Sequence, residues 1–169
     1  DLYVQERIAR GLEKRPADTV AGALHTGLAQ AKKPEELRRV VRLAGRVACK
    51  DARTDLEPLL DHKDDRVRSE AAKALGLLKD PAAAAALVKA LDDKSPYVRL
   101  EAVTALARLL PPAEFRSYAA KIRKDAIELI RLQLVVELAD QGDPAGIAEI
   151  APLISDPAWP GKDSGFSEI

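Results

Sequence analysis

A short pattern that occurs twice constrains this chain more than any other feature of its sequence. The copies are DRVRSEAAKALGLL from Asp65 and SPYVRLEAVTALARLL from Ser95, so Val67 and Val98 lie 31 residues apart. In each copy Arg follows the valine, and Ala or Leu recurs four, seven, eight and eleven residues after it. This spacing lines one face of a helix. The sequence therefore predicts two equivalent helices, whose alanines let a neighbouring helix approach closely.

Two weaker copies flank the strong pair. Ile130 lies 32 residues after Val98 and is followed by Arg131. Upstream, Leu37 is followed by Arg38 and begins the fourth copy. The pattern therefore continues in both directions along the chain.

Shorter helices are expected between these copies. Asp80 is a typical N-cap and Pro81 a typical first helical residue, and Asp143 and Pro144 repeat the pair 63 residues later. A period near 31 residues that contains two helices predicts stacked hairpins, which bury their apolar faces against one another.

The predicted fold class is all-α, a right-handed superhelix of about four to five helical hairpins. We assign residues 1–155 to this solenoid. Residues 156–169, DPAWPGKDSGFSEI, are rich in Pro, Gly and Ser and are expected to form a loop, a disordered end or a cap.

Two longer phrases, LLDHKDDRVRSEAAKALGLLKDP and ALDDKSPYVRLEAVTALARLLPP, resemble the HEAT-repeat family. The likeness is to its short bacterial form, which is also found in phycobilin lyases. It is specific over residues 51–110 and looser over 17–50 and 111–155. The resemblance implies that the second helix of each hairpin lines a concave side of the stack.

The resemblance also implies a polar ladder between neighbouring repeats. Its acidic members would be Asp61 and Asp92, each six residues before its valine, and its basic members Arg68, Arg99 and Arg131. Turn amides at helix N-termini need acceptors, which gives the ladder a structural role. A direct role in ligand binding is the alternative.

Composition argues against several classes of function. The formal net charge is zero, which disfavours a general nucleic-acid binder. His25, His62 and Cys49 do not form a convincing metal site, because Thr26 and Lys63 follow the two lone histidines and no histidine adjoins the cysteine. No phosphate-binding loop or nucleophile motif occurs. We therefore predict no catalytic residue, no cofactor and no metal.

The location of the protein is expected to be cytoplasmic. The single cysteine fits a reducing compartment, and neither a signal peptide nor a membrane span is visible. The sequence begins at Asp1, so a targeting segment removed before this point is the alternative.

A basic stripe is the strongest candidate for a binding site. Arg38, Arg42, Arg46 and Lys50 follow one another at steps of four, with Arg39 beside them. The first 50 residues carry 11 Lys and Arg against 6 Asp and Glu. On a concave-side helix, this stripe would face an acidic protein or peptide. The alternative is a solvated face that binds nothing.

The last strong helix, residues 126–139, is apolar nearly all round. We expect residues 144–155 to cover it, with Trp159 or Phe166 helping. A second copy of the chain or further repeats could cover it instead, which leaves self-association open.

Three functions follow from these features. The first is a non-catalytic scaffold or adaptor that binds a partner protein or peptide on the concave face. The second is a phycobilin-lyase-like enzyme that handles a tetrapyrrole. The third is nucleic-acid binding through the basic N-terminal helices, which the zero net charge disfavours.

Overall fold

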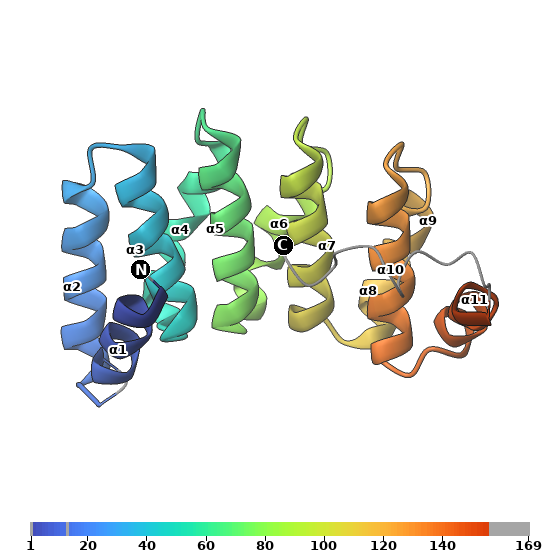
Figure 1. The fold of residues 1–169 in the computed structure, drawn as a ribbon, viewed down its shortest axis with the longest axis horizontal. Coiled ribbons are helices and arrows are strands. Elements are labelled where there is room, and N and C mark those ends of the chain that lie inside the picture. The colour runs from blue at the N-terminus through green and yellow to red at the C-terminus, as the bar shows by residue number, and fades with distance from the viewer. Residues whose placement is uncertain (1, 13, 156–169) are drawn as a thin grey trace.

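The computed structural model describes residues 2–12 and 14–155, and within this part of the chain the regular elements are all helices (Figure 1). The longer helices are α1 (Leu2–Leu12), α2 (Ala17–Gln30), α3 (Pro34–Arg46), α5 (Asp65–Leu78), α7 (Pro96–Leu109), α10 (Glu128–Asp140) and α11 (Pro144–Ser155). The shorter ones are α4 (Arg53–Leu56), α6 (Ala84–Ala90), α8 (Pro112–Ser117) and α9 (Ala119–Ile122), with 3₁₀ turns η1 (Lys50–Ala52), η2 (Glu57–Asp61) and η3 (Pro81–Ala83).

The helices form a stack of two layers. Helices α3, α5, α7 and α10 stand side by side in a row, and the shorter α4, α6, α8 and α9 lie behind them (Figure 1). Helix α2 packs against α3 at one end of the row, and α11 packs against α10 at the other. This arrangement confirms the predicted all-α superhelix of stacked hairpins.

Aspartates begin several of these helices, as their sequence context predicts. The Asp64 side chain accepts hydrogen bonds from the first backbone N–H groups of α5. Asp80 accepts from the N–H of Ala82, with Pro81 as the first residue of η3. Asp143 accepts from the N–H of Ala145 in the same way, ahead of α11. Each contact satisfies a donor that would otherwise lack a partner at a helix N-terminus.

The core runs along the stack between the two layers. Val67, Val98, Ala71 and Ala102 have no exposed surface, as the repeated pattern predicts. The largest buried side chain is Phe115, on α8. Apart from that ring, the core is built mainly from Ala, Val and Leu, which lets adjacent helices lie close together.

Two glycines set the closest approach between helices of the row. A Cβ added to Gly45 would lie 2.9 Å from the Cα of Ala74, and one added to Gly76 would lie 2.8 Å from the Cα of Ala105. Both distances are shorter than a side chain tolerates. Backbone therefore packs directly against backbone at these two points, and no larger residue fits without a shift of the helices.

The two glycine contacts also establish which residues of α3 are equivalent to which residues of α5. Gly45 and Gly76 are both the twelfth residue after the N-caps of their helices, Lys33 and Asp64. In this register Leu37, not Arg38, is equivalent to Arg68. The α3 copy predicted from the sequence begins one residue too late, because Leu37–Arg38 resembles the Val–Arg pair of the strong copies.

Helix α11 covers one side of α10, as the sequence predicts. A Cβ added to Gly146 would lie 2.7 Å from the backbone N of Ala139, so the two helices are in close contact. On another side of α10, Leu129 is 37% exposed and Val136 is 43% exposed. Trp159 and Phe166, which were expected to help cover this helix, lie outside the described residues. None of the described helices is long and apolar enough to cross a lipid bilayer.

Candidate functional site

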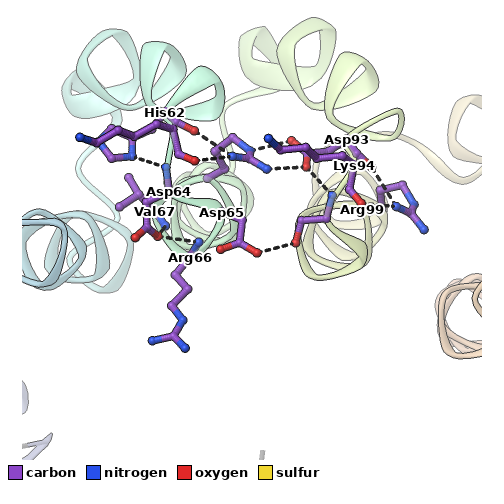
Figure 2. Close-up of polar contacts among 11 residues, drawn as sticks. His62, Asp64, Asp65, Arg66, Val67, Asp93, Lys94 and Arg99 are labelled. Atoms are coloured by element: carbon purple, nitrogen blue, oxygen red, sulfur yellow. Dashed lines mark hydrogen bonds and ion pairs between the residues drawn. The ribbon is translucent and has the colours of Figure 1, made fainter.

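Two arginine–aspartate pairs join neighbouring repeats at equivalent turns, and Figure 2 shows the first of them, at Asp93. Arg68 of α5 donates from Nε and Nη2 to the two carboxylate oxygens of Asp93, at 2.7 and 2.8 Å. Arg99 of α7 does the same to Asp125, at 2.6 and 2.9 Å. We call each pair a rung. Both are bidentate, and the Arg68 side chain is only 5% exposed.

Each rung also makes hydrogen bonds to backbone atoms of the turn that precedes a helix. Arg68 donates from Nη1 to the carbonyl oxygens of His62 and Lys63, and Asp93 accepts from the backbone N–H of Ser95. Arg131 donates to the carbonyl oxygen of Asp125 in the equivalent place. The rungs therefore hold the turns and the helices in one rigid arrangement.

Both rung carboxyl groups are held in their charged form. Burial works against the charge of Asp93, but hydrogen bonds from Arg68 and the backbone of Ser95 keep its pKa below the ordinary value. For Asp125 the hydrogen bonds from Arg99 dominate and lower the pKa.

The acidic members of the ladder differ from those expected. Asp92 is exposed and pairs with Lys121 at 2.7 Å, whereas Asp93 contacts Arg68. Asp61 is exposed at the end of η2, and the described contacts of Arg68 do not include it. The rung carboxylate stands two residues before the N-cap, where it can reach both the turn amide and the arginine of the preceding repeat.

The first repeat lacks this pair entirely. His62 occupies the place of the aspartate, and its Nδ1 accepts a hydrogen bond from the backbone N–H of Asp64 at 3.1 Å. Leu37 occupies the place of the arginine. Both partners are thus replaced together at the step from α3 to α5. Because a histidine stands 31 residues before Asp93, the repeat pattern in the sequence matched Asp61 with Asp92 instead.

The row of helices has one face that is not covered by the second layer. On α3 it is formed by the residues 2, 5, 6, 9 and 13 positions after the N-cap, namely Glu35, Arg38, Arg39, Arg42 and Arg46. The equivalent residues of α5, α7 and α10 lie 31, 62 and 94 positions later. All of them are at least partly exposed. We call this surface the open face, and Figure 2 shows Arg66 pointing onto it, away from the rungs.

Some of the predicted basic stripe is used within the molecule. Arg42 donates from Nε and Nη2 to the carboxylate of Glu70, at 3.1 and 2.6 Å. Arg46 lies 3.9 Å from a carboxylate oxygen of Glu6 on α1. The ion pair with Glu70 takes Arg42 out of the set of free charges, contrary to the view of the stripe as an unbroken row of available cations.

A similar pair joins the next two helices of the row. Lys73 lies 4.0 Å from Glu101, at the positions equivalent to Arg42 and Glu70. Burial raises the pKa of Glu101, and the nearby charge of Lys73 only partly offsets this effect. Ion pairs therefore cross the open face at two successive steps.

Three arginines at one end of the open face remain available. Within the described part of the chain, Arg38, Arg39 and Arg66 take part in no ion pair. The Nε of Arg38 is buried without a hydrogen-bond partner among the described residues. Arg38 and Arg66 line a shallow concavity of about 430 Å³, together with Asp65, Glu70 and Tyr97. Lys50, the last residue of the predicted stripe, is exposed on η1, beyond the end of α3.

The remaining candidates for chemistry lie apart from this surface. His25 contacts Asp55 through Nδ1 at 3.1 Å, and Cys49 is buried. Across the described residues, no group of three or more His, Cys, Asp or Glu side chains is placed to hold a metal ion.

Comparisons with known proteins agree with this architecture. The family model for HEAT repeats matches residues 22–107, which is just over half of the chain. No curated protein matches it in sequence.

Solved structures share the fold at low sequence identity. A chain in the complex of CpcE and CpcF of phycocyanin lyase from Nostoc sp. PCC7120 has a TM-score of 0.69 at 19% identity, covering 93% of this chain and 66% of that one. An engineered protein has a TM-score of 0.52 at 20% identity, covering 91% and 81%. The present chain thus spans just under two thirds of the lyase-complex chain. Together with the repeated pattern and the helical stack, the family match shows that this protein belongs to the HEAT-repeat family.

Proposed function

We propose that this protein is a non-catalytic interaction module that binds an acidic segment of a partner protein on its open face. One observation carries the proposal: Arg38 and Arg66 line a concavity, Arg39 is exposed on the same face, and none of the three has an ion pair within the described residues. Several other charges of the row are matched within the molecule, through rungs and cross-helix pairs. Unmatched cations that cluster at one end of this surface favour an external anion.

The chemistry of these side chains favours carboxylates. Guanidinium groups are permanently charged and grip a carboxylate through two parallel hydrogen bonds, as Arg68 and Arg99 do inside this protein. A nucleic acid needs many neutralised phosphates, whereas the whole chain has a net charge of zero. An acidic protein segment needs only a few such contacts.

Charge reversal at Arg39 and Arg66 tests the proposal. The probe is a fluorescein-labelled peptide rich in glutamate and serine, with binding followed by fluorescence anisotropy. We expect the double variant R39E/R66E to bind at least about tenfold more weakly, because each lost cation removes a charge-assisted contact of roughly 1.5–3 kcal/mol. The melting temperature should stay nearly unchanged, since both side chains lack internal pairs.

A matched control uses exposed lysines outside the open face, one on α6 and one in the turn after α9. Lys89 and Lys124 are both exposed and lie away from the open face. The variant K89E/K124E changes net charge by the same amount and should bind the peptide almost as well as the wild type. Equal weakening by both variants would show that only overall charge matters and would contradict the proposal.

Arg42 is unsuitable for this test. Reversing its charge beside Glu70, whose side chain is only 10% exposed, would place two carboxylates together and lower stability. Any loss of binding by an Arg42 variant would therefore mix folding with recognition.

A second candidate function is that of a phycobilin-lyase-like enzyme, favoured by the shared fold with a chain of the phycocyanin lyase complex. Incubation with a bilin, with absorbance as the readout, separates the two functions. The interaction module should leave the absorption spectrum of the bilin unchanged, whereas a lyase-type protein should shift it. Short DNA duplexes in an electrophoretic shift series at increasing salt test the nucleic-acid alternative, for which we expect no specific complex.

A further inference from the structure

The open face changes its chemistry steadily from one end of the row to the other. Over the five positions that define it, the net charge is +3 on α3, +1 on α5, zero on α7 and −1 on α10. The positive charge of the open face is therefore concentrated at its α3 end. A partner segment with acidic residues throughout its length would match only that end.

Apolar side chains increase in the opposite direction. At the position five residues after the N-cap, the row reads Arg38, Ser69, Leu100 and Leu132. Four residues further along each helix, the series of equivalent residues ends on α10 with Val136, which is 43% exposed. The α10 end therefore presents aliphatic surface to solvent at the level where the α3 end presents guanidinium groups.

Tyr97 marks the boundary between the two ends. It is 69% exposed on α7 and lines the same concavity as Arg38 and Arg66. A tyrosine ring offers apolar area and a hydroxyl group together, and such residues are enriched in binding surfaces. The cationic part of the open face is thus followed by an exposed aromatic ring on the next helix of the row.

We propose that the bound partner segment crosses the row with an acidic part over α3 and α5 and an aliphatic part over α7 and α10. This inference rests on the proposed function and adds the composition and the direction of the segment. Charge complementarity places the acidic end of the segment over α3 and α5. Leu129 and Val136 are exposed in the free protein, and their burial on binding places the aliphatic end over α10. Nucleic acid does not fit, because its charge does not decline along its length.

The dimensions fit a short extended peptide. Three helix-to-helix steps of roughly 8–10 Å span about 24–30 Å. An extended chain rises about 3.3 Å per residue, so about seven to nine residues cover the row.

Two labelled peptides of about twelve residues, somewhat longer than this span, provide the test. The block peptide carries glutamates, a Gly-Ser spacer and then Leu, Ile and Val. The acidic peptide has the same glutamates and spacer, with Ser in place of the aliphatic residues. We expect the block peptide to bind at least tenfold more tightly, because two linked contacts reinforce one another.

Substitutions at the apolar end assign that gain to α10. In the variant L129E/V136E the block peptide should bind no better than the acidic peptide, and both substitutions are at exposed sites that should leave the fold intact. The control A85E, at an exposed site on α6 in the other layer, should leave the tenfold difference unchanged. Loss of the difference in the control would overturn the assignment.

The direction of the peptide is measured separately. A nitroxide at the acidic end should broaden amide signals of α3 in NMR spectra, and a nitroxide at the aliphatic end should broaden those of α10. Reversed or uniform broadening would overturn the inference.

The two proposals fail in different ways. If the block and acidic peptides bind equally well, and R39E/R66E weakens both, the inference is wrong and the proposed function stands. If neither peptide binds the wild-type protein, both are wrong. If an aliphatic peptide without glutamates binds as tightly as the block peptide, the acidic contact contributes nothing and both are again wrong.

Discussion

The step from α3 to α5 and the step from α7 to α10 hold neighbouring helices together by different contacts. The first step has a glycine contact, Gly45 against Ala74, but no rung. The last has the rung Arg99–Asp125, but Ala107 stands where the earlier helices have glycine. Between them, the step from α5 to α7 has both kinds of contact.

This difference shows that the two contacts are independent. The rungs lie at the N-terminal ends of the helices, where they bind the preceding loops. The glycine contacts lie about two helical turns further along each helix. At the last step, Gln141 donates to the carbonyl oxygen of Ala107 at 2.8 Å and supplies a polar contact near the missing glycine. A repeat stack therefore tolerates loss of either contact at a step that keeps the other.

The largest effect should come from breaking the rung of the middle step. In Arg68→Ala, Asp93 keeps a charge that is largely buried and has lost its partner, which should cost about 3–5 kcal/mol of unfolding free energy. Urea unfolding followed by circular dichroism measures it. Arg66→Ala, two residues away and exposed, should change stability by less than about 0.5 kcal/mol. Similar losses in the two variants would contradict the structural role of the rung.

The glycine contact should give the next largest effect. Gly76→Ala would place a Cβ 2.8 Å from the Cα of Ala105 and should destabilise the protein by about 1–3 kcal/mol through overpacking. Gly22→Ala on α2 is the matched control, since a Cβ there meets nothing within 4 Å. It should stabilise the protein by up to about 1 kcal/mol, because alanine favours the helix. Thermal unfolding should thus shift in opposite directions.

Introducing a rung between α3 and α5 should have a smaller effect on stability. Leu37→Arg alone should lower stability, because it removes a leucine packed against the core and supplies no carboxylate. Adding His62→Asp supplies that carboxylate at the equivalent position. A double-mutant cycle should give a favourable coupling of about 1 kcal/mol. Purely additive effects would show that the first two repeats are not positioned as the later ones are.

The smallest signal is expected in the dependence of stability on pH. The pKa values of Asp93 and Asp125 are lower in the folded protein than the ordinary value. Their contribution is therefore complete above about pH 4 and is lost as the pH falls through the folded pKa values. Glu101 has a raised pKa, so its contribution has the opposite sign and is lost as the pH rises. Urea titrations from neutral to acidic pH should show a shallower acid loss in Asp93→Asn than in the wild type.

The sequence predicted the repeating fold well because its signal is local. Val67 and Val98 begin helix faces with identical spacing, and Asp80–Pro81 and Asp143–Pro144 mark helix starts by their own backbone chemistry. The α3 copy was misplaced by one residue because its apolar positions satisfy either register. Only the contact of Gly45 with the next helix distinguishes them.

The candidate site was predicted in outline but not in detail. The basic stripe of α3 is visible in the sequence as a step of four residues. That Arg42 pairs with Glu70, 28 residues away, is not visible, and neither is the gathering of Arg38, Arg66 and Tyr97 from three helices around one concavity. The sequence pattern pointed to Asp92 and not to Asp93, because two adjacent aspartates look alike in sequence. Only the geometry of the turn determines which of them contacts Arg68.

Sequence alone thus determined the elements of this protein: which segments are helical, which face of each is apolar, and that the hairpins repeat. These depend on interactions between residues a few positions apart, which the spacing of side chains records. Tertiary structure alone decided which charges are matched internally and which have no ion pair within the described residues. That outcome depends on distances between side chains of different repeats, set by the backbone contacts at Gly45 and Gly76 and by the rungs that fix the turns.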